Sequence, residues 1–318
     1  MVMDMFKVAC IGECMIEMAP VASNTYKRGF AGDTFNTAVY FKRQFSDQLQ
    51  VSYISALGQD SLSDATCEKM ELEGVDTQLI LRVEGGQPGL YLIENDSHGE
   101  RFFSYWRSVS AARTMFKGMD ENAIYDLLKP FQLIYLSGIS LAILDAAQRC
   151  CLLKALAKLQ NRTVIAFDPN YRSALWRDIE ECIGVFKKMA RISSIVLSTF
   201  DDDKAIWGDV SIDTAGQRWR DWGVKEVVIK NGPEGCHVYA EEISSHVPAP
   251  ETIKPLDTTG AGDSFCAGYL GARLLGNTEM QAALLAHKIA GQVIRHSGGV
   301  ITQENWHPVT ELHSSFQY

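Results

Sequence analysis

Apolar runs of strand length alternate with helical patterns along most of this 318-residue chain. The runs typical of strands are 7–11, 51–56, 133–136, 164–167, 195–197 and 226–229. Helical patterns occupy 34–44, 61–73, 144–159, 179–189 and 212–222, with two more at 264–275 and 278–296. Because the strand runs are almost continuously apolar, they indicate a mostly parallel sheet that is covered by helices on both faces. The sequence therefore predicts an α/β fold, in which ligands bind beyond the carboxyl ends of the strands.

Two stretches break this rhythm, because each contains strand patterns with no helix between them. They are 13–30 and 89–107, and the second is interrupted by the turn composition of residues 95–99. We expect a small β-sheet that protrudes from the main body as a lid, formed by approximately 13–31 and 88–108. Since no repeat or Pro-rich linker separates this sheet from the rest, the sequence predicts a single domain over 1–318.

The composition argues against several classes of protein. Hydrophobic residues make up 46% and charged residues 22% of the chain, which is ordinary for a globular protein with a substantial core. The net charge of −9 argues against a nucleic-acid partner, which would need a basic face. No apolar run approaches the ~18 residues of a membrane span, and the first residues do not resemble a signal peptide. The eight cysteines lack zinc-ligand spacing, so we expect reduced thiols in a cytoplasmic protein.

The run Asp257-Thr258-Thr259-Gly260-Ala261-Gly262-Asp263 is the strongest functional signal in the chain. It follows an extended stretch at 253–256 and opens the helical pattern at 264–275, so its glycines lie at a helix N-terminus. Backbone N–H groups there lack partners, and the helix dipole favours an anion such as phosphate. The same field favours the charged form of Asp263, which can then accept a proton from a hydroxyl. The run differs from a Walker A loop and indicates phosphoryl transfer to an alcohol, although a tight turn with an N-terminal charge would also produce it.

Three polar side chains share one face of the strands predicted for the lid. Tyr91 lies on the first of these strands, and Tyr105 and Arg107 alternate on the second. Tyrosine hydroxyls suit sugar hydroxyls, and a guanidinium suits a carboxylate through paired hydrogen bonds. The alternative is an amphipathic hairpin with packed aromatic rings and a solvated arginine.

Two loops carry further candidate residues. Asp168-Pro169-Asn170-Tyr171-Arg172 follows the strand pattern at 164–167 and so lies at a carboxyl end, where a plain turn is the alternative. Phe30-Ala31-Gly32-Asp33-Thr34-Phe35-Asn36 opens the helix at 34–44. Gly32 permits a ligand to approach the backbone closely, and Asp33 and Asn36 can bind vicinal hydroxyls, unless they merely cap the helix.

Together these stretches resemble the ribokinase-like family of carbohydrate kinases. The family's C-terminal signature matches Asp257–Asp263, its N-terminal glycine motif matches Ala31–Ala38, and the resemblance extends from Lys7 to about Val300. Within the family, the chain is most similar to 2-keto-3-deoxygluconate kinases. The stretches that indicate this are Ile11–Glu17, Gly32–Thr34, Gly89–Tyr91, Tyr105–Arg107 and Leu136–Ser140.

The resemblance implies the ribokinase-like fold, ATP and Mg²⁺ as cofactors, and a role for each matching residue. Asp263 is implied as the base, with the amides of Gly260, Ala261 and Gly262 stabilising the transferring phosphoryl group. Sugar contacts are implied for Gly32, Asp33, Asn36, Tyr91, Tyr105 and Arg107, and Arg172 is placed near the sugar acid or the phosphates. The nucleotide site is implied at Asn170, Ser198, Lys230, Gly232, Gly235, Ala290 and Val293.

The chain departs from the family pattern near the implied Mg²⁺ site. Many members carry Asn-x-x-Glu there, whereas this chain has Thr199-Phe200-Asp201-Asp202. Asp202 is a hard oxygen ligand that can hold a metal-bound water. The alternative is that these aspartates only form the acidic first turn of a helix.

Three functions fit these observations. The first is an ATP-dependent kinase acting on 2-keto-3-deoxygluconate in sugar-acid breakdown, whose lid excludes water and whose arginines bind the carboxylate. The second is the same mechanism on a neutral sugar such as fructose or ribose, which would not need Arg107. The third is a sensor that binds sugar or nucleotide without turnover. We also expect that the apolar lid residues Leu90, Leu92, Phe102 and Trp106 either cover the main body or pair with a second copy in a homo-oligomer.

Overall fold

The centre of the protein is a large, mostly parallel sheet. The structure is a computed structural model that describes residues 5–22, 24–95, 101–241, 243–250 and 253–310. Within these residues the sheet has nine strands in the order β13-β12-β11-β10-β9-β8-β1-β4-β5. Strands β11 to β5 pair in parallel, and β12 and β13 join antiparallel at one edge. The bounds are β1 Phe6–Ile11, β4 Leu49–Leu57, β5 Ile80–Arg82, β8 Leu133–Ser137, β9 Val164–Asp168, β10 Ile195–Thr199, β11 Glu226–Lys230, β12 Cys236–Ala240 and β13 Ile243–Val247.

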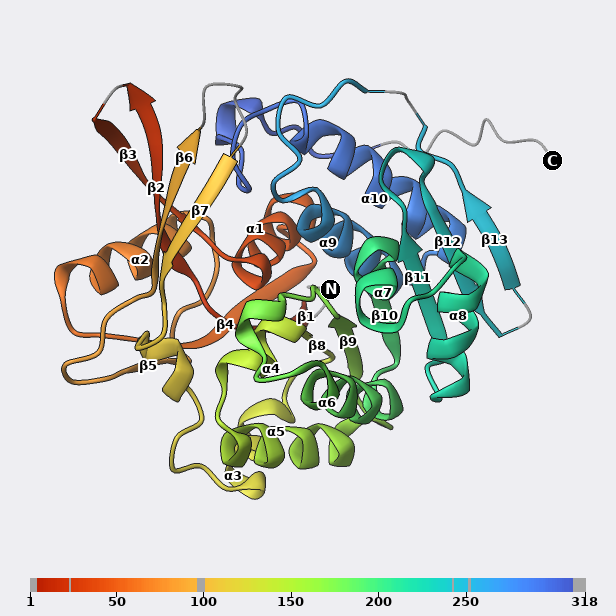
Figure 1. Cartoon of the computed structure of the whole chain (residues 1–318), viewed down its shortest axis with the longest axis horizontal. Coiled ribbons are helices and arrows are strands. Elements are labelled where there is room, and N and C mark those ends of the chain that lie inside the picture. The colour runs from red at the N-terminus through yellow and green to blue at the C-terminus, as the bar shows by residue number, and fades with distance from the viewer. Residues whose placement is uncertain (1–4, 23, 96–100, 242, 251–252, 311–318) are drawn as a thin grey trace.

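Helices cover both faces of this sheet (Figure 1). One face is covered by α1 (Asp33–Gln44), α2 (Ser61–Leu72), α9 (Ala261–Leu274) and α10 (Glu279–Val293). The other is covered by α3 (Glu121–Leu128), α4 (Gly138–Ile143), α5 (Ala146–Leu159), α6 (Ile179–Ile192), α7 (Phe200–Trp207) and α8 (Ile212–Asp221). Strand periodicity divides the core: in β1, Val8 and Cys10 face one helical layer while Ala9 and Ile11 face the other. The predicted α/β fold is confirmed.

A second, smaller sheet stands away from the first and confirms the predicted protruding sheet (Figure 1). It consists of β2 (Met15–Ala22), β3 (Thr25–Ala31), β6 (Leu90–Asn95) and β7 (Arg101–Trp106), in the order β3-β2-β6-β7. Tyr91 and Tyr105 are directly opposite each other on β6 and β7, which agrees with the predicted pairing of faces. Residues 96–99 of the turn predicted between these strands lie outside the described residues.

The structure differs from the predicted elements in several places. The extended stretch at 253–256 joins neither sheet, because Pro255 has no N–H for a ladder and Leu256 is exposed with its amide bonded to the Ile294 carbonyl. The helix predicted at 144–159 begins at Ala146, after a separate short helix, α4. The edge strands β5, β12 and β13 and the helix α3 were not predicted.

The carboxyl ends of the parallel strands bring the candidate residues to one edge of the large sheet. Strand β9 ends at Asp168, β10 leads into α7 at Thr199, and β11 ends at Lys230. These three strands are neighbours in the sheet, so their loops lie side by side. Among the described residues, no helix combines the length and the apolar character that a membrane crossing requires.

Candidate active site

Asp263, in the first turn of α9, is held by two side chains from α1. Asn36 Nδ2 donates a 2.8 Å hydrogen bond to Asp263 Oδ2. Thr37 Oγ1 donates to the backbone carbonyl of Asp263 over 3.2 Å. Asn36 and Thr37 are both buried, so their positions are fixed by packing. Two helices that are remote in the sequence therefore meet at this aspartate.

The surroundings of Asp263 oppose its ionisation. Burial and the Asp33 carboxylate raise the pKa of Asp263 to about 8, with a smaller contribution from Asp168, while Asn36 and Lys230 act in the opposite direction. The expectation that the helix dipole keeps Asp263 charged is therefore wrong for the protein alone. A helix terminus contributes only ~0.3–1 kcal/mol, which burial among carboxylates outweighs. A pKa near 8 suits a general base that works close to neutral pH.

The N-terminus of α9 has no capping side chain. Its N-cap residue is Gly260, which has φ 76° and, as a glycine, offers no side chain to accept a hydrogen bond from the first turn. The Ala261 amide donates to the Thr258 carbonyl at 3.2 Å, so it is already used in the turn. The amides of Gly262 and Asp263 belong to the first turn, where N–H groups have no partner within the helix. The turn has the predicted backbone geometry at Gly262 and Asp263, whereas the Ala261 amide is already bonded, and anion binding there stays a prediction.

A buried ammonium group lies directly below this first turn. Lys230 Nζ is 2.7 Å from Asp168 Oδ2 and 3.5 Å from Cys266 Sγ. A Cβ built on Gly262 would lie 3.5 Å from the same nitrogen. Burial lowers the pKa of Lys230, but Asp168 more than offsets this effect, so the net shift is upward and the group is charged. Of these residues, the sequence singled out Lys230, placed Asp168 only within a loop motif and missed Cys266.

The loop after β9 meets the beginning of α1. Asn170 Nδ2 donates to Asp33 Oδ2 at 2.9 Å, so a residue predicted for the nucleotide site lies next to one predicted for the sugar site. Asn170 has φ 32°, and its amide is bonded to Asp168 Oδ1 at 3.1 Å. The close approach predicted at Gly32 is made by the protein itself, since a Cβ there would lie 2.1 Å from the Glu13 carbonyl oxygen.

Asp202 and Arg172 both bind the backbone of Tyr171, in the loop after β9. Asp202 Oδ2 accepts a hydrogen bond from the Tyr171 amide at 3.2 Å, and Arg172, which is exposed, donates to the Tyr171 carbonyl at 2.7 Å. Burial and the Asp168 carboxylate raise the pKa of Asp202 to about 6, while Arg172 opposes this shift. A cation would relieve the repulsion between these carboxylates, so the donors fit a Mg²⁺ held largely by water and phosphate. The described residues contain no cluster of three or more His, Cys, Asp or Glu side chains that could bind a metal alone.

The two lid tyrosines form one aromatic face. The rings of Tyr91 and Tyr105 lie 5.7 Å apart at their centres. Tyr91 is buried and its hydroxyl donates to the Glu17 carboxylate, whereas Tyr105 is half exposed. The lid therefore offers one tyrosine hydroxyl that is fixed and one that is free to contact a ligand.

Arg107 is not the free cation that the sequence suggested. Its Nη2 donates to Glu13, which also accepts a hydrogen bond from Ser110. The side chains of Arg107 and Glu13 are only 10% and 1% exposed, so the pair is fixed in place. Sequence reasoning missed Glu13 as a partner, although its position directly after β1 places it at the carboxyl edge of the sheet.

A cavity of about 730 Å³ opens between α10 and the segment that precedes α9. Gly232 and Ala290, two of the residues predicted for the nucleotide site, line this cavity. Thr258 and Ala261 line it as well, so the cavity adjoins the N-terminus of α9. Its volume is within the range that small-molecule sites occupy, ~300–1,000 Å³.

Five other residues predicted for the nucleotide site do not line this cavity, and two of them, Asn170 and Lys230, make the contacts described above. Ser198 and Val293 are fully buried, so their side chains reach no solvent-filled space. Gly235 has φ 97°, and a Cβ there would lie 2.2 Å from the Val247 carbonyl oxygen. Its conformational freedom therefore serves the packing of β12 against the end of β13.

Comparisons with known proteins show which family and which fold this chain shares. The model of the pfkB family carbohydrate kinase matches residues 5–306. The 2-dehydro-3-deoxygluconokinase of Dickeya dadantii (strain 3937) is 44% identical over 302 residues, which are 93% of this chain and 97% of that protein. The structure of 2-dehydro-3-deoxygluconokinase from Thermotoga maritima is similar with a TM-score of 0.81 at 20% identity, covering 93% of this chain and 96% of that one. Aminoimidazole riboside kinase from Salmonella enterica, in complex with aminoimidazole riboside and an ATP analog, gives a TM-score of 0.79 at 23% identity, covering 92% and 94%.

These solved structures share the fold that the resemblance implied, and the family model covers nearly the whole chain. The predicted family resemblance is therefore confirmed: this protein belongs to the pfkB family of carbohydrate kinases.

Proposed function

We propose that this enzyme transfers a phosphoryl group from ATP to 2-keto-3-deoxy-D-gluconate, giving 2-keto-3-deoxy-6-phosphogluconate in sugar-acid breakdown. The single observation that carries the chemistry is Asp263, an aspartate with a pKa of about 8 at the uncapped N-terminus of α9. The substrate follows from the similarity to the Dickeya protein named for this activity. In this proposal residues 1–318 act as one kinase domain, and the small sheet is its lid.

Asp263 acts as the general base. Once ionised, its carboxylate accepts the proton of the primary hydroxyl as that oxygen attacks the phosphoryl group. Asn36 keeps the carboxylate aimed through its 2.8 Å hydrogen bond. The first-turn amides of Gly262 and Asp263 and the ammonium of Lys230 below them stabilise the charge on the transferring group.

ATP is expected in the cavity lined by Gly232 and Ala290, with its phosphates toward Thr258 and Ala261. Bound Mg²⁺ would neutralise part of the charge on those phosphates. Asp202 is the carboxylate that would hold its water ligands, and the Asp168 side chain remains paired with Lys230.

The sugar lies between α1 and the lid in this proposal. Asp33 contacts its hydroxyls, and Tyr105 closes over it from β7, while Gly32 and Asn36 shape the floor. Arg107 and Arg172 are the cations available to the carboxylate, and the ion pair with Glu13 orients the first of them. That ion pair also supports a second candidate, a kinase for a neutral sugar, because it already compensates the charge of Arg107.

An ADP-release assay with Mg²⁺-ATP tests the proposal directly, with 2-keto-3-deoxygluconate, fructose, ribose and gluconate compared at equal concentrations. We expect the highest kcat/KM with the keto-deoxy acid and a loss of roughly 10²–10⁴-fold in kcat for Asp263→Asn, the usual contribution of a general base. A preference for fructose or ribose would replace the substrate and keep the mechanism. Tight nucleotide binding without turnover of any sugar would instead indicate a sensor.

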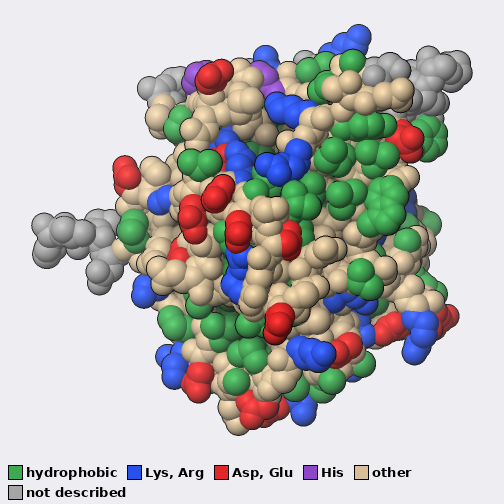
Figure 2. Space-filling view, turned by 90° about the vertical axis from the view of Figure 1, so that its left-hand side faces the viewer, with side chains coloured by type: hydrophobic (Ala, Val, Ile, Leu, Met, Phe, Trp, Pro, Cys, Tyr) green, Lys and Arg blue, Asp and Glu red, His purple; other side chains and the backbone are tan. Residues whose placement is uncertain are grey.

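The outer face of the lid is the proposed contact for a second copy of the chain. Phe102 and Trp106 are 53% and 59% exposed, and they alternate along β7 with the ligand-facing Tyr105. Figure 2 views the side of the molecule where β2 and β3 lie in Figure 1, and it shows hydrophobic side chains gathered on the upper part of that side. Sedimentation equilibrium of the protein and of a Phe102→Ser, Trp106→Ser variant would test this contact.

A further inference from the structure

Gly299 lies in close contact with both Gly260, at the N-terminus of α9, and Asn36, which binds Asp263. A Cβ built on Gly260, the N-cap of α9, would lie 2.3 Å from the Gly299 carbonyl oxygen. A Cβ built on Gly299 would lie 2.7 Å from Asn36 Nδ2, the nitrogen that binds Asp263. The Gly299 peptide therefore separates the anion-binding turn from the amide that aims the base, and a small displacement would change both.

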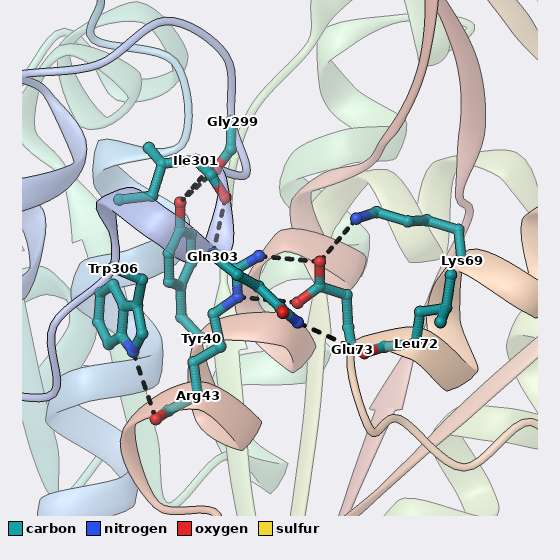
Figure 3. Close-up of polar contacts among 9 residues, drawn as sticks. All are labelled: Tyr40, Arg43, Lys69, Leu72, Glu73, Gly299, Ile301, Gln303 and Trp306. Carbon is teal, nitrogen blue, oxygen red and sulfur yellow. Dashed lines mark hydrogen bonds and ion pairs between the residues drawn. The ribbon is translucent and has the colours of Figure 1, made fainter.

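A buried tyrosine on α1 fixes the position of this peptide (Figure 3). Tyr40 donates a 2.9 Å hydrogen bond to the Gly299 carbonyl, and its oxygen accepts one of 3.1 Å from the Ile301 amide. Its ring is fully buried and packs against Trp306 at a centre-to-centre distance of 5.5 Å. Burial raises the pKa of Tyr40, so the hydroxyl stays protonated and remains a donor.

A buried ion pair holds the same segment one turn further along α1 (Figure 3). Arg43 Nη1 donates to the Ile301 carbonyl at 2.7 Å, while its Nε and Nη2 each bind Glu73 at 2.8 Å. Lys69 adds a second contact to Glu73 at 2.6 Å. The side chains of Arg43 and Glu73 are 6% and 1% exposed, so this anchor does not move freely in solvent.

The spacing of these residues explains how one helix performs both tasks. Asn36, Tyr40 and Arg43 are four and three residues apart, so they share one face of α1. Along this face, α1 binds the Asp263 carboxylate, the Gly299 carbonyl and the Ile301 carbonyl in turn. The helix thereby couples the position of the base to the position of the segment that supports the anion-binding turn.

We propose that Tyr40 is a positioning residue for phosphoryl transfer, which acts through Gly299 on the distance between the anion-binding turn and Asp263. This inference rests on the proposed role of Asp263 as the base. Removing the hydroxyl leaves the Gly299 carbonyl without its donor and the Ile301 amide without its acceptor. The peptide then shifts, and the phosphoryl group and the attacking oxygen are no longer held at the reactive distance.

The test compares Tyr40→Phe with Tyr269→Phe in the ADP-release assay. Tyr269 is a matched control, because it is fully buried on α9 and its hydroxyl donates to Glu226 at 2.8 Å, away from the site. We expect Tyr40→Phe to lower kcat by roughly tenfold to a hundredfold, as misplacements of up to ~1 Å do, with the KM for the sugar nearly unchanged. Tyr269→Phe should keep kcat within about twofold despite losing a comparable hydrogen bond. An unchanged kcat for Tyr40→Phe, or an equal loss in both variants, would overturn the proposal.

A second pair of variants tests the close contact between Gly299 and Asn36 and leaves Tyr40 unchanged. Gly299→Ala pushes against Asn36, whereas Gly184→Ala on α6 meets no atom within 4 Å and serves as the control. Only the first should slow kcat, and equal activity of both would contradict the proposal. Asp263→Asn, measured alongside, separates the two claims. If it retains turnover, the proposed base is wrong, and if it is inactive while Gly299→Ala and Tyr40→Phe remain fast, only the positioning role fails.

Discussion

Replacing Asn36 with alanine should move the acidic limb of the pH–rate profile upward. The substitution removes the 2.8 Å hydrogen bond that favours the ionised form of Asp263. A hydrogen bond to a charged group contributes ~1.5–3 kcal/mol, and one pKa unit corresponds to about 1.36 kcal/mol. The pKa of Asp263 should therefore rise by about one to two units from its value of about 8. Asp33, Asp168 and Lys230 stay in place and leave the other contributions unchanged.

The sign and the size of this effect are both measurable. Because the proposed base works only when ionised, we expect activity to be lost as the pH falls through the pKa of Asp263, and a higher pKa moves that loss to higher pH. At pH 7, kcat/KM should fall roughly tenfold to a hundredfold, whereas near pH 10 the loss should be much smaller. The assay is ADP release from pH 6 to pH 10.5. The control is Thr37→Val, since Thr37 binds the Asp263 backbone carbonyl and not the carboxylate. A uniform loss at every pH, or an equal shift in the control, would refute the reasoning.

Three further predictions concern charged groups in and around the site. Glu13→Gln removes the ionic partner of Arg107, so the KM for the keto-deoxy acid should rise about tenfold in the ADP-release assay, and an unchanged KM would exclude Glu13 as an orienting group. Lys230→Met leaves the Asp168 carboxylate buried and unpaired, which should cost about 3–5 kcal/mol of unfolding free energy in urea titrations, and a cost below ~1 kcal/mol would contradict this. Burial lowers the pKa of His287 from 6.5 to about 4. As the pH falls below about 6.5, the imidazole of His287 therefore takes up a proton in the unfolded chain while it stays neutral in the folded protein. The free energy of unfolding should decrease by up to about 3 kcal/mol between pH 6.5 and pH 4. His287→Phe should flatten that slope in urea titrations at pH 7.5 and pH 5, and an unaltered slope would assign the effect to other groups.

The elements that the sequence predicted best are those in which local periodicity and burial agree. The runs in β1, β9, β10 and β11 are apolar on both faces, because helices cover both sides of the sheet, and each was predicted to within a few residues. The edge strands β12 and β13 were missed, since β13 is largely exposed and lacks an apolar run. The stretch 253–256 has the composition of a strand, but it lies beside α10 without a neighbouring strand to pair with.

In the candidate site, too, local features could be predicted from the sequence, whereas contacts between remote residues could not. Glycines at the N-terminus of α9 and an aspartate in its first turn are local features, so the residue pattern alone is enough to identify them. The partner of Arg107 could not be predicted in this way, because Glu13 is 94 residues away and its carboxylate is buried by the fold. The same holds for Asn36, whose amide binds Asp263 across 227 residues and was expected to bind sugar.

The sequence by itself determined the α/β architecture, the protruding sheet and the position of the glycine turn at the N-terminus of α9, because these depend on periodicity and on residue types within a few positions of each other. Tertiary structure alone decided the ionisation of Asp263 and the pairing of Arg107 with Glu13. It also decided the hydrogen bond from Tyr40 to the Gly299 carbonyl. The reason is that electrostatic energies and close contacts depend on distance in space and on burial, and both arise only when remote segments are brought together.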